Sequence, residues 1–264
     1  LQYHVNGNLS IIKNKVLTLG MGNVQQTNGM VGNGSDLFIG YPMDMFYGYK
    51  TDGVFLNDNE VASWYDQTAI AKGSRAGDLR FVDVTGDNKV TNADKVYLGS
   101  RIPKYTFGLN LGLAYSGIDF SMLIQGVAGV KGLLTSYAGL AFNQEGNIQR
   151  WQMKENWNVQ QDNRYPGYPR LEVTSGSGSP NTQLSDFWVQ NASFVKVRNI
   201  QVGYTIPQNQ TKKWGISNAR VYLSLDNPIS IDHYKKGWDP ENTKNNGTYY
   251  PVMSTYTLGL TLSF

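Results

Sequence analysis

Residues 83–94 carry oxygen-bearing side chains at the spacing of a twelve-residue calcium-binding loop. In such a loop, side-chain oxygens at positions 1, 3, 5, 9 and 12 and a main-chain carbonyl at position 7 surround the ion. The corresponding residues are Asp83, Thr85, Asp87, Thr91 and Asp94, together with the carbonyl of Lys89. The sequence therefore predicts a structural Ca²⁺ site in this loop, with Val90 as its apolar anchor.

Two positions of this loop depart from the calcium-binding pattern. Asn88 stands where glycine is usual, although asparagine adopts the left-handed conformation more readily than most residues. Asp94 stands where a glutamate is usual, which shortens the reach of the last ligand. The alternative interpretation is a metal-free turn whose side chains accept hydrogen bonds from the loop's own backbone.

The chain offers little support for catalysis. His4 and His233 are its only histidines, and no residue near either completes a nucleophilic triad. Two pairs of carboxylates are close in sequence: Asp58 with Glu60, and Asp239 with Glu241. Closeness in sequence does not establish the separation that glycoside hydrolysis requires. We therefore expect no catalytic residues, and expect that the protein is not an enzyme.

Aromatic residues crowd the segments between the candidate strands. They are Tyr41, Phe46, Tyr47, Tyr49, Phe55, Trp64, Tyr65, Trp151, Trp157, Tyr165 and Tyr168. Some could stack on a sugar or a peptide. Long loops also need a small core of their own, and we favour that role for any single one of these residues.

The elements that must position these loops are strands with alternating side chains. In residues 255–264, the large apolar residues share one parity and the small or weakly polar residues share the other. Successive side chains of a strand point to opposite faces. A strand of about ten residues can cross a bilayer at a tilt, with one face toward lipid and the other toward a lumen. We expect Leu109 and Leu260 to face lipid, and Asn110 and Thr261 to face the lumen.

The same alternation recurs along the chain. It is found in residues 1–12, 105–115, 118–127, 194–206 and 219–227. Ser116 and Gly117 predict a tight turn between the second and third of these segments. In the fourth segment the parity changes, which predicts a β-bulge near Arg198 and Asn199.

The connections between these strands alternate in length. Segments 13–102, 129–192 and 230–253 are long, whereas those at 116–117 and 207–218 are short. In an up-and-down barrel, alternate connections lie on alternate sides, so all the long ones fall together as external loops. We therefore predict an all-β fold, an antiparallel transmembrane β-barrel with long external loops. Because about eight strands are needed to close a lumen, we expect further strands upstream of Leu1.

The composition excludes several other classes of protein. The net charge is +3 and no run of three basic residues occurs, so no nucleic-acid partner is expected. The absence of cysteine excludes disulfides and thiolate metal sites. No apolar stretch approaches the roughly 18 residues of a membrane helix, so a membrane-spanning form must be a closed barrel.

Beyond these patterns, an ordered set of motifs resembles a known family. The motifs are GYP (40–42), FYGYKTDGVF (46–55), GDLRFVD (77–83), GD (86–87), LG (98–99), PKYTFGLN (103–110), FWV (187–189), VRNI (197–200), GYTIP (203–207), WDP (238–240) and TLGL (257–260). They resemble the C-terminal quarter of a SusC/RagA-type TonB-dependent outer-membrane transporter, over nearly the whole chain.

The resemblance implies a plugged barrel of about 22 strands. Residues 1–264 would be the C-terminal portion of the barrel domain, and the plug domain would lie outside this chain. It also implies TonB-dependent import of a glycan or oligopeptide across the outer membrane of a Gram-negative cell. The partners would be a SusD-like surface lipoprotein, outer-membrane lipid, and TonB, which would contact a part of the protein upstream of this chain. Apart from calcium, no cofactor is expected. The main alternative is a soluble calcium-binding β-sandwich that recognises carbohydrate, and a weaker one is a glycoside hydrolase.

Overall fold

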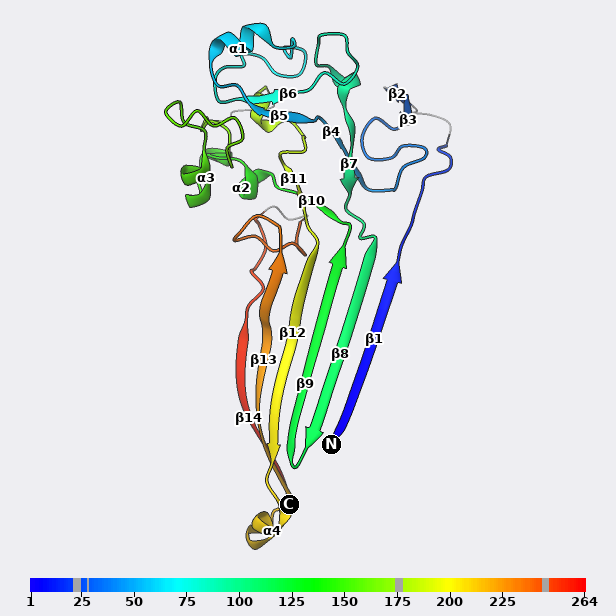
Figure 1. The fold of residues 1–264 in the computed structure, drawn as a ribbon, viewed down its shortest axis with the longest axis vertical. Coiled ribbons are helices and arrows are strands. Elements are labelled where there is room, and N and C mark those ends of the chain that lie inside the picture. Colours follow the sequence, from blue (N-terminus) through cyan, green and yellow to red (C-terminus); the bar gives the residue numbers. More distant parts are fainter. Residues whose placement is uncertain (21–24, 28, 174–177, 244–246) are drawn as a thin grey trace.

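The dominant feature of the structure is one six-stranded antiparallel sheet (Figure 1). The structure is a computed structural model that describes residues 1–20, 25–27, 29–173, 178–243 and 247–264. The strand order is β1 (Gln2–Ile11), β8 (Tyr105–Tyr115), β9 (Ile118–Ala128), β12 (Phe194–Thr205), β13 (Asn218–Asp232) and β14 (Thr255–Ser263). Each of these strands lies beside the long strand that precedes or follows it along the chain. The arrangement is that of an up-and-down barrel wall, of which this chain supplies a part.

The long strands occupy the segments that the alternation of side chains predicts. The predicted bulge is also confirmed, because the pairing of β12 with both neighbours shifts between Val197 and Asn199. One boundary differs. β13 ends at Asp232, beyond the predicted end at 227, because its pairing with β12 resumes after the bulge. The third long connection therefore begins at 233 rather than 230. Pro228, which lacks a backbone N–H, lies inside the strand, just beyond the predicted end.

Two short connections join the long strands at one end of the sheet (Figure 1). Ser116 and Gly117 have φ angles of 49° and 84°, as a two-residue type I′ hairpin turn requires. The other short connection contains α4 (Gln208–Thr211) and η4 (Lys212–Trp214), and the left-handed Gly215 ends η4. In the part of the chain that is described, no helix is both long and apolar enough to cross a membrane.

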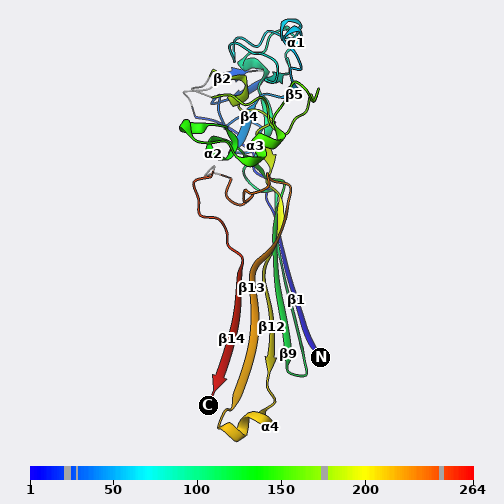
Figure 2. The same cartoon turned by 90° about the vertical axis from the view of Figure 1, so that its left-hand side faces the viewer.

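The first two long connections fold together at the opposite end of the sheet (Figures 1 and 2). We call the described residues of 13–104 and 129–193 the loop lobe. Its strands are β2 (Gln25–Thr27), β3 (Met30–Gly32), β4 (Met45–Gly48), β5 (Thr51–Val54), β6 (Leu79–Phe81), β7 (Val96–Ser100), β10 (Lys131–Leu133) and β11 (Val189–Asn191). Its helices are α1 (Asp58–Ser63), η1 (Asn92–Asp94), α2 (Ser136–Gly139), η2 (Asn143–Glu145), α3 (Arg150–Glu155) and η3 (Pro180–Thr182). The third connection also begins near this end of the sheet, and it returns to β14 partway along the sheet.

Aromatic side chains form the core of the loop lobe. One cluster holds Tyr49 with Val54, Leu79 and Phe81, and a second holds Tyr168 with Trp188. Most aromatic residues of the connections therefore have the structural role that we favoured. Tyr165 is an exception, since 68% of it is exposed. Because Trp157 and Phe187 of the second connection pack against the cluster around Tyr49 of the first, the two connections pack together.

Candidate functional site

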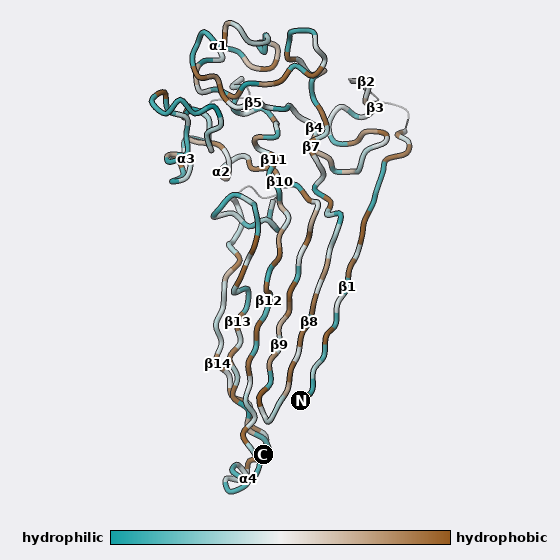
Figure 3. The backbone as a smooth tube through the Cα atoms, in the orientation of Figure 1, coloured by the Kyte–Doolittle hydropathy of each residue, from teal (hydrophilic) through white to brown (hydrophobic). Residues whose placement is uncertain are grey.

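The six-stranded sheet has one apolar face and one polar face. The strand register pairs apolar residues of neighbouring strands with one another. Val5 lies opposite Leu111, and Leu111 lies opposite Met122. The same face continues through β12, β13 and β14 with Ile200, Val202, Leu223, Leu225, Tyr256, Leu258 and Leu260. The hydropathy colouring of Figure 3 alternates along these strands. Leu109 and Leu260 thus share the apolar face, and Asn110 and Thr261 share the opposite one, as predicted.

The apolar face is exposed. Leu258 is 77% exposed and Tyr3 75%, and no second sheet among the described strands packs against this face. A soluble β-sandwich would need such a second sheet, because its core forms between two inner faces. An exposed apolar surface of this extent indicates contact with an apolar partner. A barrel wall in a membrane places lipid there.

The opposite face carries polar side chains that pair with one another. Near the short connections, Arg220 Nε donates a hydrogen bond to Asp119 Oδ1 at 2.9 Å, and Arg220 Nη2 donates to Gln201 at 3.1 Å. Farther along the sheet, Asn199 Nδ2 donates to Asp226 Oδ1 at 2.8 Å. Ionisable residues at membrane depth face an interior and find partners there. These pairs therefore fit the lumen side of a barrel wall.

A buried lysine fixes the third long connection to this polar face. Lys196 of β12 is 4% exposed, and its Nζ lies 2.7 Å from Asp239 Oδ1 and 2.8 Å from Glu241 Oε2. Arg198 also pairs with Glu241. A buried ammonium group needs such compensation, since an unpaired buried charge is strongly unfavourable. Residues 239–241 are thereby held over the polar face at the lobe end of the sheet.

Two cavities lie beside this ion-paired segment. One of about 450 Å³ is bounded by the upper part of β13 and by residues from the segments 237–240 and 247–254. The other, of about 420 Å³, is bounded by Arg101, Val127, Phe194 and residues 240–243. Pro240 lines both cavities. Since Lys196 and Phe194 belong to the polar side of β12, the cavities lie where a lumen would open toward the loop lobe.

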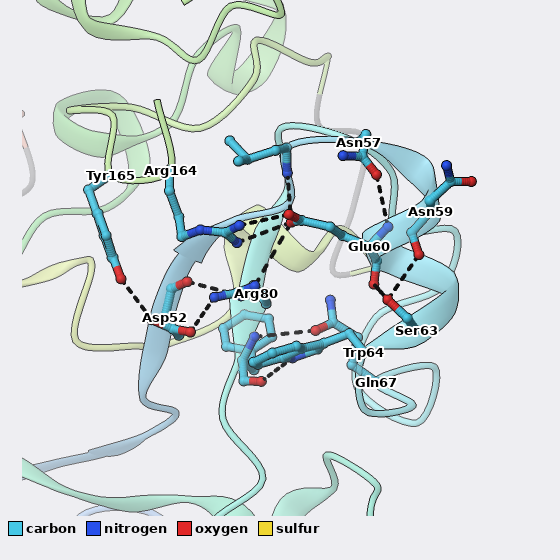
Figure 4. Close-up of polar contacts among 12 residues, drawn as sticks. Asp52, Asn57, Asn59, Glu60, Ser63, Trp64, Gln67, Arg80, Arg164 and Tyr165 are labelled. Carbon is cyan, nitrogen blue, oxygen red and sulfur yellow. Dashed lines mark hydrogen bonds and ion pairs between the residues drawn. The ribbon is translucent and has the colours of Figure 1, made fainter. Parts of the chain in front are cut away.

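A second network of ion pairs lies within the loop lobe (Figure 4). Arg80 of β6 is 8% exposed, pairs with Asp52 of β5, and places its guanidinium 4.0 Å from the ring centroid of Trp64. Glu60 of α1 accepts hydrogen bonds from Arg164 Nη1 and Nη2 at 3.0 and 2.7 Å. Arg164 belongs to the second long connection, whereas Glu60 belongs to the first. The network therefore ties the two connections to each other.

The charge of Glu60 is favoured by this arrangement. The hydrogen bonds from Arg164, together with the Leu56 backbone N–H and the nearby Arg80, hold the pKa of Glu60 below its usual range despite its partial burial. Tyr165 adds a further link between the connections, because its hydroxyl donates to Asp52 Oδ1 at 2.9 Å. All these groups pair with one another, which indicates a structural role for the network.

The predicted calcium ligands lie in one loop that hydrogen bonds hold together. Asp83 accepts from the backbone N–H of Gly86 and Asn88, at 2.6 and 2.7 Å. Asp87 accepts from the N–H of Lys89 at 3.0 Å. Asn88 has a φ of 65°, so it adopts the left-handed conformation that its position in the loop requires. The loop has the turn geometry that both interpretations predict.

Asp94 is the centre of the loop. Its Oδ1 accepts hydrogen bonds from the N–H of Val84 and of Thr85, and its Oδ2 accepts from the N–H of Thr91. Burial alone would raise the pKa of Asp94, but the hydrogen bonds from Thr91, Thr85 and Val84 outweigh it and lower that pKa. The carboxylate thus caps η1 and links the two ends of the loop.

These contacts bear on how well the loop would fit calcium. Each carboxylate oxygen has two lone pairs, so Asp83 and Asp87 keep capacity to accept an ion. Asp94 Oδ1 has less, since it also accepts from the Thr85 hydroxyl. Within the described residues, no three acidic, histidine or cysteine side chains are already gathered to hold a metal. The calcium site, with ligands Asp83, Thr85, Asp87, Lys89, Thr91 and Asp94, stays a prediction.

Both carboxylate pairs noted in the sequence are engaged in structural contacts. Glu60 binds Arg164, and Asp58 Oδ1 accepts from the Ala76 N–H at 2.9 Å. Asp239 and Glu241 bind Lys196. Sequence reasoning did not single out Lys196, Arg80 or Arg164. A signal was available for Lys196, because a charged residue on the polar side of an alternating strand needs a counter-charge from a neighbouring connection.

Known proteins resemble this chain in sequence. TonB-dependent receptor P3 of Formosa agariphila is 27% identical over 239 residues, which cover 85% of this chain and 22% of the receptor. TonB-dependent receptor SusC of Bacteroides thetaiotaomicron is 29% identical over 188 residues, covering 70% of this chain and 17% of SusC. The chain thus spans about a fifth of the length of these relatives. No protein-family model matches it. The relatives are receptors, in agreement with the expectation that the protein is not an enzyme.

Solved structures resemble this chain in fold. A structure of the RagAB peptide transporter superposes with a TM-score of 0.69 at 20% identity, over 99% of this chain and 27% of that chain. The RagAB peptide importer in its closed-closed state gives a TM-score of 0.64 at 21% identity, over the same shares. At such identity the likeness shows the fold. Sequence and fold together confirm the resemblance of this chain to a part of a SusC/RagA-type TonB-dependent transporter.

Proposed function

We propose that the chain forms part of the wall and external surface of an outer-membrane barrel that imports large nutrients. The nutrients would be glycans or oligopeptides, and the energy would be relayed by TonB. The observation that carries this proposal is the six-stranded sheet, which exposes a continuous apolar face and pairs its charges on the other face. The TonB-dependent receptors that resemble the chain support the same function.

The two ends of the sheet suggest its orientation in the membrane. Outer-membrane barrels carry their long loops outside and their short turns on the periplasmic side. The loop lobe and the third connection, which correspond to the predicted loops 13–102, 129–192 and 230–253, would therefore face the exterior of a Gram-negative cell. Parts of these segments, residues 21–24, 28, 174–177 and 244–246, lie outside the described residues. A SusD-like surface lipoprotein would dock on the lobe, and TonB would contact the protein outside this chain.

A structural calcium ion is part of the proposal. The oxygen spacing of residues 83–94 supports it, as does the left-handed Asn88. Asp83 and Asp87 would supply most of the charge. The ion would stiffen the exposed turn of the loop lobe, and no chemistry on the nutrient would depend on it.

Uptake in cells tests the proposed function. Cells that produce the intact protein are given fluorescent casein peptides and, separately, a fluorescent glycan digest. We expect one of the two pools to enter the periplasm when TonB is present and to stay outside when TonB is deleted. Equal entry with and without TonB, or entry unchanged when the gene for the intact protein is removed, contradicts the proposal.

A further inference from the structure

β13 and β14 separate partway along the sheet (Figure 2). The last pair between them joins Asp226 to Thr255, and β13 then runs on to Asp232 paired with β12 alone. Asn227, with a φ of 49°, lies at this separation, opposite the bulge of β12. Among the described residues, no strand pairs with the other edge of β13 between 227 and 232. The two strands thus form a fork that opens toward the loop lobe.

The free edge of β13 offers main-chain hydrogen-bonding groups. In an antiparallel pair, alternate residues direct their N–H and C=O groups toward one neighbour, and the remaining residues direct theirs away. Every second residue within 229–232 therefore presents its donor and acceptor to the fork. No backbone hydrogen bond joins these residues to the described part of the third connection. A free edge of this kind is a template for another extended chain.

The cavity of about 450 Å³ lies along this edge. Residues 227–230 and Asp232 form one wall, and Trp238, Tyr249 and Val252 belong to the other. The rings of Trp238 and Tyr249 meet edge to face with centroids 6.4 Å apart. A volume of this size, with aromatic side chains in one wall, is in the range of ligand-binding pockets.

The polar side chains around the cavity already have partners. Asp232 accepts from Ser230 Oγ at 2.9 Å, and Asp239 holds Lys196. Asn227 Nδ2 donates to the Met253 carbonyl at 3.3 Å. A saccharide presents hydroxyl groups on all sides and needs free side-chain partners. An extended peptide needs a row of main-chain groups instead, and the edge of β13 supplies that row.

We propose that the edge of β13 at residues 229–232 binds an extended oligopeptide by strand addition. Alternate side chains of the peptide enter the cavity beside Trp238 and Tyr249, and the others point away. At about 3.4 Å per residue, the edge accommodates about four residues of the peptide. The inference rests on the proposed function, and it names oligopeptide as the class of nutrient that this site takes.

The test measures peptide binding and amide protection on the intact protein in detergent. The probe is a tryptic digest of casein, and the comparison probe is a digest of dextran. In the variant Val252→Trp, the indole fills the cavity. The matched control is Met253→Trp. Met253 is the next residue along the chain, is similarly exposed, and does not line the cavity. Hydrogen exchange of the amides at 229–232 is followed with and without each probe.

We expect casein peptides to slow exchange at 229–232 and dextran to leave it unchanged. Val252→Trp should reduce the amount of retained peptide by about tenfold or more, whereas Met253→Trp should leave it within about twofold, as binding in the cavity requires. Several results overturn the inference: peptide binding without protection at 229–232, no peptide binding, protection by dextran alone, or equal loss in both variants. The uptake experiment on cells that produce the intact protein separates these failures from a failure of the proposed function. If those cells import a glycan only when TonB is present, the proposed function holds although this inference fails.

Discussion

At the scale of single residues, Asp94 shows how one buried carboxylate can order an exposed loop. Backbone N–H groups from both ends of the loop converge on its two oxygens, and η1 begins at the hydrogen bond between Thr91 and this side chain. The sequence predicted that Asp94 faces the centre of the loop, but it did not distinguish an ion from amides as the partner. Both interpretations need oxygen atoms at the same spacing.

The calcium prediction is tested on the loop itself. Calcium at millimolar concentration should slow proteolysis between residues 83 and 94 of the intact protein, and EDTA should restore the faster cleavage, because an ion bound by Asp83 and Asp87 would cross-link the turn. Asp87→Ala should abolish the calcium effect while leaving the hydrogen bonds of Asp94 in place. Magnesium should protect less, since it demands tighter octahedral geometry. Cleavage that is equally slow in calcium and in EDTA would exclude the site.

The pair formed by Glu60 and Arg164 predicts a dependence on pH. Because Arg164 lowers the pKa of Glu60, the stabilisation from this pair is complete above the ordinary glutamate pKa of about 4.3 and is lost as pH falls through the lowered value. Limited proteolysis with pepsin should therefore release residues 156–166 more readily as pH falls from about 5 to 3. In the variant Arg164→Leu, which lacks the pair, pepsin should release residues 156–166 readily already at about pH 5. An identical cleavage profile for the variant and the native protein across that range would refute the role of the pair.

At the scale of elements, alternation predicted which residues form the long strands and which face each side chain occupies. It was sufficient because the side chains of a membrane-spanning strand face either lipid or the lumen, in strict alternation. It did not predict the upper part of β13, where Asn227 and Pro228 interrupt the pattern. The three-residue strands of the loop lobe were also missed. These strands carry too few residues to show a period. Some of them also pair segments that are distant in sequence, as Lys131–Leu133 does with Val189–Asn191.

The two faces of β14 give a matched pair of substitutions. Leu258 lies on the apolar face opposite Leu223, and Thr257 lies on the polar face opposite Ser224. In the intact protein, Leu258→Arg should lower the free energy of unfolding by roughly 2–4 kcal/mol if the position is near the bilayer midplane. Thr257→Arg should cost much less, because its side chain would enter the lumen. Urea unfolding in lipid vesicles measures both. Equal costs would mean that the apolar face does not contact lipid.

At the scale of the whole molecule, the structure separates a two-faced sheet from a lobe with its own core. Two connections that leave the sheet between different strands share the cluster around Tyr49 and the ion pair of Glu60 with Arg164. The alternation of long and short connections predicted that they lie together. It did not predict which side chains join them, because partners such as Lys196 and Asp239 are brought together only by the fold.

The central claim is that this sheet spans the outer membrane with the loop lobe outside, and labelling on intact cells tests it most directly. The native chain has no cysteine, so a single introduced cysteine is the sole thiol of this segment. Asn59 is exposed on α1 at the lobe end, and Lys213 is exposed on η4 at the opposite end. Asn59→Cys should react with an impermeant maleimide on intact cells that lack any capping lipoprotein. Lys213→Cys should react only after the outer membrane is opened. Labelling of Lys213→Cys on intact cells, or of both variants only after opening, would contradict the account.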